Sequence, residues 1–348
     1  MKRNLQHIDE IRFLIIHLIL INHWMLSVAL IMNSVDKSLI DFWFELTSPT
    51  LSLISGYLFF YRTKDNFGYA KKVKTRFHSL VIPYLFWSLS FFFIYFFIKK
   101  SYLFLFHNSF WYEPVRPMTV RNFIGTVANP PLINFWYLQN LIFIIPFNFI
   151  FYYLLKYRYV YILILIGIIG IYAYNYMDIY FSPRFLPFYM LGAFLGYNEI
   201  YLPKINLKFY TSRYATSIIL VPILFFITTR TSDLDYTGIF TLPYKICIVL
   251  FFVICVFNLL DANPDSWTFK YLKKYKDYSF FLFAIHMFFF TIVQRSLLKL
   301  GVEHYLLNKY YSLIFNIFSL IVVIVMSFSL AKFLKTKVPK FYFLIVGR

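Results

Sequence analysis

Long apolar runs recur along most of this chain, separated by short stretches rich in charged residues, aromatic residues and proline. A helix that crosses a bilayer needs about 20 predominantly apolar residues. Runs near this length lie at residues 11–32, 41–61, 79–98, 134–155, 159–176, 185–199, 214–231, 239–260, 278–298 and 311–334. The pattern predicts an all-α integral membrane protein, a bundle of about ten transmembrane helices. The run at 185–199 is short, so that helix would tilt or enter the bilayer only part-way.

The first run has some features of a secretory signal peptide. Lys2 and Arg3 precede it, and Ser27-Val28-Ala29 resembles a cleavage site. However, Arg12 and His23 interrupt the run, and its hydrophobic character continues beyond the small residues. We therefore interpret it as the first membrane helix.

Composition supports a membrane protein and limits its partners. Hydrophobic residues make up 60% of the 348, and the mean hydropathy is +0.65, which leaves no room for a large soluble domain. A net charge of +19 would point to nucleic acid in a soluble protein. In a membrane protein it fits basic cytoplasmic loops that face anionic lipids, so we expect contacts with membrane lipids and none with nucleic acid. No cluster of Cys and His has metal-ligand spacing, so we expect no metal site.

Lysine and arginine are unevenly distributed between the two sides of such a bundle. With the N-terminus inside, 22 of them fall on the cytoplasmic side and 10 on the outer side. Cytoplasmic loops carry the excess of positive charge in membrane proteins. We therefore predict that both termini are cytoplasmic, that residues 99–133 form the longest outer loop, and that the protein resides in the inner (cytoplasmic) membrane.

The first predicted helix concentrates polar residues that a plain membrane anchor would not contain. Arg12 and His23 are 11 residues apart, so they lie within about 20° of each other around the helix and about 16 Å apart along it. Asp9 stands one turn before Arg12 and can pair with it. If Arg12 marks the cytoplasmic interface, His23 lies near the middle of the bilayer. Polar groups inside a span are costly unless partnered, which makes both residues functional candidates.

Each candidate also has a simpler interpretation that the residues alone leave open. Arg12 could extend its guanidinium to the interface, and His23 could bond to a neighbouring helix. His286 is expected about 12 Å deep in its helix, where it could line a tunnel or be a partnered core histidine. Glu45, at the outer end of the second predicted helix, could meet a sugar or face water.

Six short motifs occur in one order over nearly the whole chain. They are Arg12, ten residues and His23, preceded by Ile8-Asp9-Glu10-Ile11; Ser55-Gly56-Tyr57-Leu58; the basic run 71–76 followed by Ile82-Pro83-Tyr84-Leu85-Phe86-Trp87; Phe135-Trp136-Tyr137-Leu138; Phe188 to Gly196; and Ser279 to His286. Each is a weak pattern alone. Together they resemble the membrane-bound acyltransferase 3 family, in which the fourth motif is a Trp-Phe-Leu element.

The resemblance implies a membrane O-acyltransferase, most often an O-acetyltransferase. Such an enzyme moves an acyl group from cytoplasmic acyl-CoA, usually acetyl-CoA, to a hydroxyl of a cell-surface polysaccharide or lipid-linked glycan. His23 would be the general base, since an imidazole can accept a hydroxyl proton near neutral pH. Glu45 and Trp136 would contact the acceptor, and glycan-assembly proteins are possible partners. The residues expected at the donor are Arg12, Lys72, Arg76 and His286.

Two departures from the family pattern bear on these roles. His78 and Ser79 stand where the family often has a second arginine in its basic loop, and Met287 follows His286 where proline is usual. We expect one membrane acyltransferase domain over residues 1–348, without the soluble extension that some members carry. The rival hypothesis is a glycan or lipid-carrier transporter, or a non-catalytic export subunit, because polar residues in spans also mark transport routes.

The predicted topology is testable with cysteines placed singly, Arg116→Cys and Lys273→Cys, and an impermeant thiol reagent applied to intact cells. The parent chain gives the background labelling. We expect labelling at position 116 and protection at position 273. Labelling at position 273 alone would mean that the topology is inverted.

Overall fold

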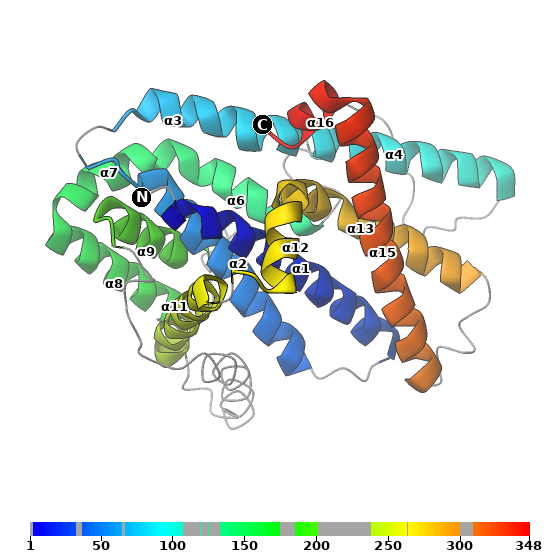
Figure 1. Ribbon diagram of the computed structural model, residues 1–348, viewed down its shortest axis with the longest axis horizontal. Helices are drawn as coiled ribbons and strands as arrows, with labels where there is room; N and C mark the ends of the chain where they lie inside the picture. Colours follow the sequence, from blue (N-terminus) through cyan, green and yellow to red (C-terminus); the bar gives the residue numbers. More distant parts are fainter. Residues whose placement is uncertain are drawn as a thin grey trace.

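The computed structural model describes residues 3–32, 37–64, 67–106, 119, 125, 133–174, 185–200, 238–262, 264–299 and 309–348. Over these residues the chain forms helices and no strand (Figure 1). The helices are α1 (Arg3–Met32), α2 (Lys37–Phe60), α3 (Tyr69–Arg76), the π-helical turn η1 (Phe77–Val81), α4 (Ile82–Phe106), η2 (Ile133–Phe135), α6 (Trp136–Ile144), η3 (Ile145–Phe147), α7 (Asn148–Lys156), α8 (Arg158–Tyr174), α9 (Leu186–Tyr197), α11 (Gly238–Ala262), α12 (Trp267–Tyr275), η5 (Lys276–Tyr278), α13 (Ser279–Lys299), α15 (Lys309–Lys337) and α16 (Pro339–Ile345).

The all-α prediction is confirmed for the described residues. Every expected apolar run coincides with helix except 214–231, which lies outside the described residues, as does most of the expected outer loop 99–133. Within the described part of the chain, four stretches are long and apolar enough to cross a membrane: Tyr69–Ile94, Trp136–Lys156, Trp267–Val293 and Ile317–Lys337. The count of about ten spans and the side of the termini stay predictions.

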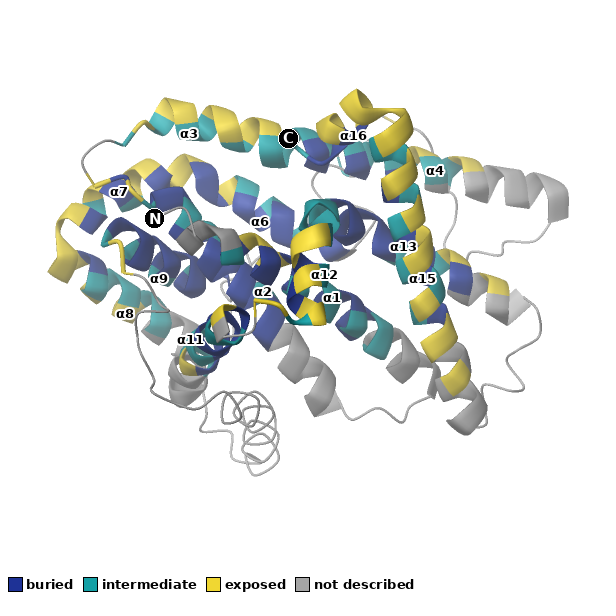
Figure 2. Ribbon diagram, viewed as in Figure 1, coloured by how far each residue is buried: buried dark blue, intermediate teal, exposed yellow. Residues whose placement is uncertain are grey.

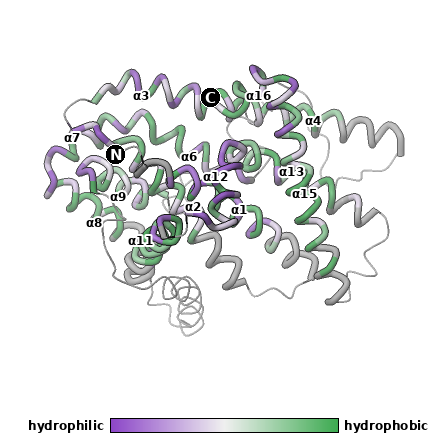
Figure 3. Tube along the Cα trace, in the orientation of Figure 1, coloured by the Kyte–Doolittle hydropathy of each residue, from purple (hydrophilic) through white to green (hydrophobic). Residues whose placement is uncertain are grey.

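The basic run 71–76, expected as a loop, is instead the helix α3. Alanine, lysine and arginine favour helix, and Gly68 stands at the position before its first turn. Through η1 the helix continues into α4, so that α3 and α4 lie along one edge of the molecule (Figure 1). Figure 3 shows hydrophilic residues on α3 and mostly hydrophobic residues on α4. The basic helix is therefore attached rigidly to an apolar one.

Among the described helices, α2 and α9 make the most extensive contact, which three glycines make possible. A Cβ on Gly56 would overlap the carbonyl oxygen of Tyr189 on α9. In the reverse direction, a Cβ on Gly192 or Gly196 would overlap backbone carbonyl oxygens of α2. Small residues let membrane helices approach backbone to backbone. Both helices are largely buried in Figure 2, so this contact lies in the core.

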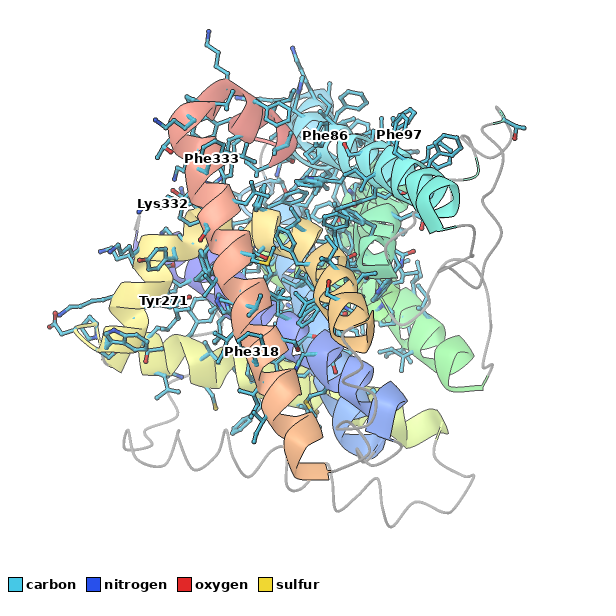
Figure 4. The ribbon with its side chains drawn as sticks, turned by 90° about the vertical axis from the view of Figure 1, so that its right-hand side faces the viewer. Phe86, Phe97, Tyr271, Phe318, Lys332 and Phe333 are labelled. Carbon is cyan, nitrogen blue, oxygen red and sulfur yellow. The ribbon has the colours of Figure 1, made fainter. Side chains whose placement is uncertain are left out.

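The outer side of α15 presents a stripe of apolar side chains. Phe318 and Phe333 are each 55% exposed, and both project from this helix in Figure 4. Ile314, Ile321 and Val325 are exposed on the same helix at intervals of three or four residues along this face. In water such a stripe would be unfavourable, so it fits contact with lipid tails.

The glycine contact predicts a sharp difference between two similar substitutions. Gly56→Ala should lower the thermal unfolding midpoint of the purified protein and reduce its folded yield, because overpacking typically costs about 1 to 3 kcal/mol. Gly167→Ala on α8 is the matched control, since a Cβ there meets nothing within 4 Å. Equal midpoints for the two variants would show that the α2–α9 contact tolerates a methyl group.

Candidate functional site

Residues from five helical elements meet at a pocket around His23. The pocket is lined by Ile19, Asn22 and His23 of α1, Thr47 and Ser48 of α2, Asn134 of η2, Trp136 and Tyr137 of α6, and Phe283 of α13. His23 is 7% exposed, and Trp136 is half-buried. Two of the residues expected at the site, His23 and Trp136, therefore line one pocket although 113 positions separate them in the sequence.

His286 lies directly beside His23. The centroids of the two imidazole rings are 5.3 Å apart, which agrees with the small depth difference expected from the sequence. His286 is fully buried, and its Nδ1 lies 3.0 Å from the carbonyl oxygen of Leu282 one turn earlier. A carbonyl can only accept, so Nδ1 carries the proton and Nε2 keeps its lone pair. That Nε2 is buried and has no hydrogen-bond partner in the part of the chain that the structure describes.

The basic residues expected at the donor form a second cluster, around Phe59 near the end of α2. The ammonium of Lys72 donates to the carbonyl oxygen of Phe59 and lies 5.4 Å from the centre of its ring. The guanidinium of Arg76 lies 5.7 Å from the same ring. A cation over an aromatic face is attracted by the ring quadrupole. One aromatic side chain thus orients two cations from successive turns of α3.

Arg12 adjoins this basic cluster. Its Nη1 lies 3.6 Å from Oδ1 of Asp9, which confirms the predicted pair, and its side chain is about half exposed (45%). Arg12 and Arg76 are close enough to interact electrostatically. Two guanidiniums and an ammonium of like charge suit a ligand with several phosphates, because arginine binds phosphate oxygens through paired N–H groups.

Tyr137 connects the basic cluster to the pocket. Its side chain is buried and lines the pocket beside His23, and its hydroxyl lies 3.0 Å from Oγ of Ser55. Arg12 and Arg76 lie near enough for their charges to act on the hydroxyl of this tyrosine. A ligand that extends from the arginines toward His23 would therefore pass this side chain.

The C-terminal segment packs against the turn that follows Arg76. The indole nitrogen of Trp87 donates to the carbonyl oxygen of Ile345 over 3.0 Å. Gly347, at φ +73°, lies so close to Ser79 of η1 that a Cβ would overlap the backbone there. Arg348 links the same segment to η5 through an ion pair with Asp277, 2.6 Å away. These contacts hold η1, and with it the end of α3.

Of the other residues expected at the site, Glu45 is on α2, but its side chain lies outside what the structure describes. Sequence reasoning gave no role at the site to Tyr137, Asn22 or Asn134. The two asparagines had a usable signal, because each is a polar residue in or beside an apolar run. Among the described residues, no group of three or more His, Cys, Asp or Glu side chains could hold a metal ion.

Comparison with known proteins decides the family. The family model described as "Acyltransferase domain" (Acyl_transf_3) matches residues 5–332, which is most of the chain. The chain belongs to the acyltransferase 3 family. It is accordingly an acyltransferase, and its apolar helices and family make it a multi-pass membrane protein.

A single segment also matches a curated protein. It is 41% identical over 58 residues to "Succinoglycan biosynthesis protein ExoH" of Rhizobium meliloti (strain 1021), which covers 17% of this chain and 16% of that protein. No solved structure matches.

Proposed function

We propose that this acyltransferase moves an acyl group, most often acetyl, from acyl-CoA to a hydroxyl of a cell-surface polysaccharide or lipid-linked glycan. The observation that carries the proposal is the juxtaposition of a cation cluster at Phe59 with a pocket holding His23, joined by Tyr137. The printed name of the similar protein, a succinoglycan biosynthesis protein, supports a polysaccharide acceptor.

The donor would bind at the basic cluster. Arg12, Lys72 and Arg76 are placed to contact the phosphates of CoA. Lys72 would release the Phe59 carbonyl to do so, while Arg76 is held over the ring. The acyl thioester would then extend past Tyr137 toward His23, with His286 bordering its inner end.

His23 would act as general base on the acceptor. It takes the proton of the attacking hydroxyl as that oxygen bonds to the thioester carbonyl carbon. The carbon–sulfur bond then breaks, and the CoA thiolate leaves and takes up a proton. In this arrangement Trp136 contacts the acceptor in the pocket, and Glu45 contacts it from α2.

The cellular setting of the proposal follows from the topology. Acyl-CoA is cytoplasmic and the basic cluster lies on α3, within the segment predicted to face the cytoplasm. We propose one membrane domain over residues 1–348 in the inner membrane, with both termini cytoplasmic and glycan-assembly proteins as partners. Family membership favours this enzyme over the transporter or export-subunit hypothesis.

The role of Arg12 can be tested by Arg12→Lys, which keeps the charge but loses the planar fork. We expect the KM for acetyl-CoA to rise because bidentate phosphate contact is lost, with the protein still folded and inserted. Arg158→Lys, a basic residue on α8, is the control. Unchanged donor kinetics in Arg12→Lys would assign Arg12 to the membrane interface alone.

The role of His23 can be tested by His23→Ala in purified protein. We expect donor binding to persist while transfer falls about 10²- to 10⁴-fold, the usual effect of removing a general base. His286→Ala should show the opposite pattern, weaker donor binding with a smaller loss in kcat.

Mass spectrometry of surface glycan from cells with and without each gene variant extends the test to the natural acceptor. Acylation at the wild-type rate by His23→Ala would contradict the mechanism and would favour the transporter or scaffold hypothesis.

A further inference from the structure

Three buried acceptor atoms in or beside the pocket lack a hydrogen-bond partner among the described residues. They are Oδ1 of Asn22, Oδ1 of Asn134 and Nε2 of His286, the last next to His23. Asn22 and Asn134 are only 3% and 1% exposed. Leaving a buried acceptor unpaired is unfavourable, so three of them together indicate that something else donates to them.

The orientation of two of these groups, Asn134 and His286, is fixed by their neighbours. Nδ2 of Asn134 donates to the carbonyl oxygen of Phe283 over 2.5 Å, which leaves Oδ1 as the free end of the amide. His286 likewise uses its Nδ1–H on Leu282 and leaves Nε2 free. In both residues the N–H group donates to a carbonyl oxygen of α13, and the acceptor atom is free to bind another group. The excess of acceptors is therefore a property of the fold.

The unpaired acceptor atoms indicate that the ligand bound here carries several hydrogen-bond donors. The thioester of an acyl-CoA offers only a carbonyl oxygen and a sulfur at the reacting end, which are acceptors and cannot satisfy these atoms. A ring with several hydroxyls offers several donors at once. The indole of Trp136, which lines the same pocket, provides an apolar surface for the C–H groups of such a ring.

We infer that Asn22 and Asn134 form a subsite for a hydroxyl-rich ring, in which their amide oxygens accept hydrogen bonds from hydroxyls next to the one that His23 deprotonates. The inference rests on the acyl acceptor proposed above and names its recognition site. Two acceptors on different elements, η2 and α1, would select for the positions of the hydroxyls as well as their number. Asn22 and Asn134 are thus residues that determine acceptor specificity.

The test measures binding of methyl α-D-glucopyranoside, methyl α-D-galactopyranoside and methyl α-D-mannopyranoside to the purified full chain without donor. Dissociation constants come from the rise of the unfolding midpoint with glycoside concentration. Cyclohexanol, a ring of the same size with one hydroxyl, is the ligand control. Asn258→Leu is the variant control. Asn258 is a half-buried amide on α11 outside the pocket, and its Nδ2 has no partner among the residues that the structure describes.

We expect at least one glycoside to bind the wild type and Asn258→Leu equally, and to bind Asn22→Leu and Asn134→Leu about 2- to 10-fold more weakly, the loss typical of one hydrogen bond. Cyclohexanol should not distinguish the variants. If Asn134→Leu fails to fold because it loses the Phe283 contact, Asn22→Leu decides alone.

The inference is overturned if no glycoside binds the wild type, or if Asn22→Leu binds as tightly as the wild type. The second result would mean that water alone satisfies the amides. Binding is measured without acyl transfer, so the outcome is independent of His23. If the protein binds glycoside and the His23→Ala variant acylates at the normal rate, the proposed function is contradicted while this subsite is still supported.

Discussion

The backbone contact between α2 and α9 is the constraint on which the site depends. Gly56, Gly192 and Gly196 allow the two helices to meet without side chains between them, so α2 has little freedom to slide or rotate. This one helix carries Phe59 at the basic cluster, Ser55 beside Tyr137, and pocket-lining residues further along its length. One residue of helix corresponds to about 100° of rotation. A shift of α2 by one residue would therefore move Phe59 away from the basic cluster, Ser55 away from Tyr137 and the lining residues away from the pocket.

The chemical character of the site changes along α1. The end near Arg12 is cationic, with Lys72 and Arg76 added from α3. The end near His23 is neutral and rich in acceptors. The acyl donor, with its phosphates, would therefore bind at the cationic end, and the acceptor, with its hydroxyls, at the neutral end. The two ends meet at Tyr137, where a thioester and a hydroxyl could come together.

The sequence predicted the helices well because apolar length depends only on local composition. It also predicted the Asp9–Arg12 pair, since residues three apart face each other on any helix. It could place His23 and His286 at similar depths, but not as neighbours, because that requires knowing that α13 packs on α1. Nor could it orient the asparagines, whose free oxygens follow from a contact with a carbonyl on another helix. Tyr137 belongs to the fourth motif, but its position between the arginines and His23 could not be predicted, because that depends on how α6 packs against α1 and α3.

The π-helical turn η1 determines how a difference of one residue in chain length affects the direction of Lys72 and Arg76. A π turn contains one residue more than the α-helical turn it replaces, and η1 lies directly between Arg76 and α4. Deleting one residue there would let the helix close into regular α geometry, with α3 and α4 keeping nearly the same relative orientation. Deleting one residue from the regular helix of α4 would instead rotate α3 by about 100° relative to the rest of α4. Lys72 and Arg76 would then point away from Phe59, with every side chain of the basic cluster still present. A relative one residue shorter at this turn could therefore keep its cations at the same surface, whereas a deletion within α4 would move them.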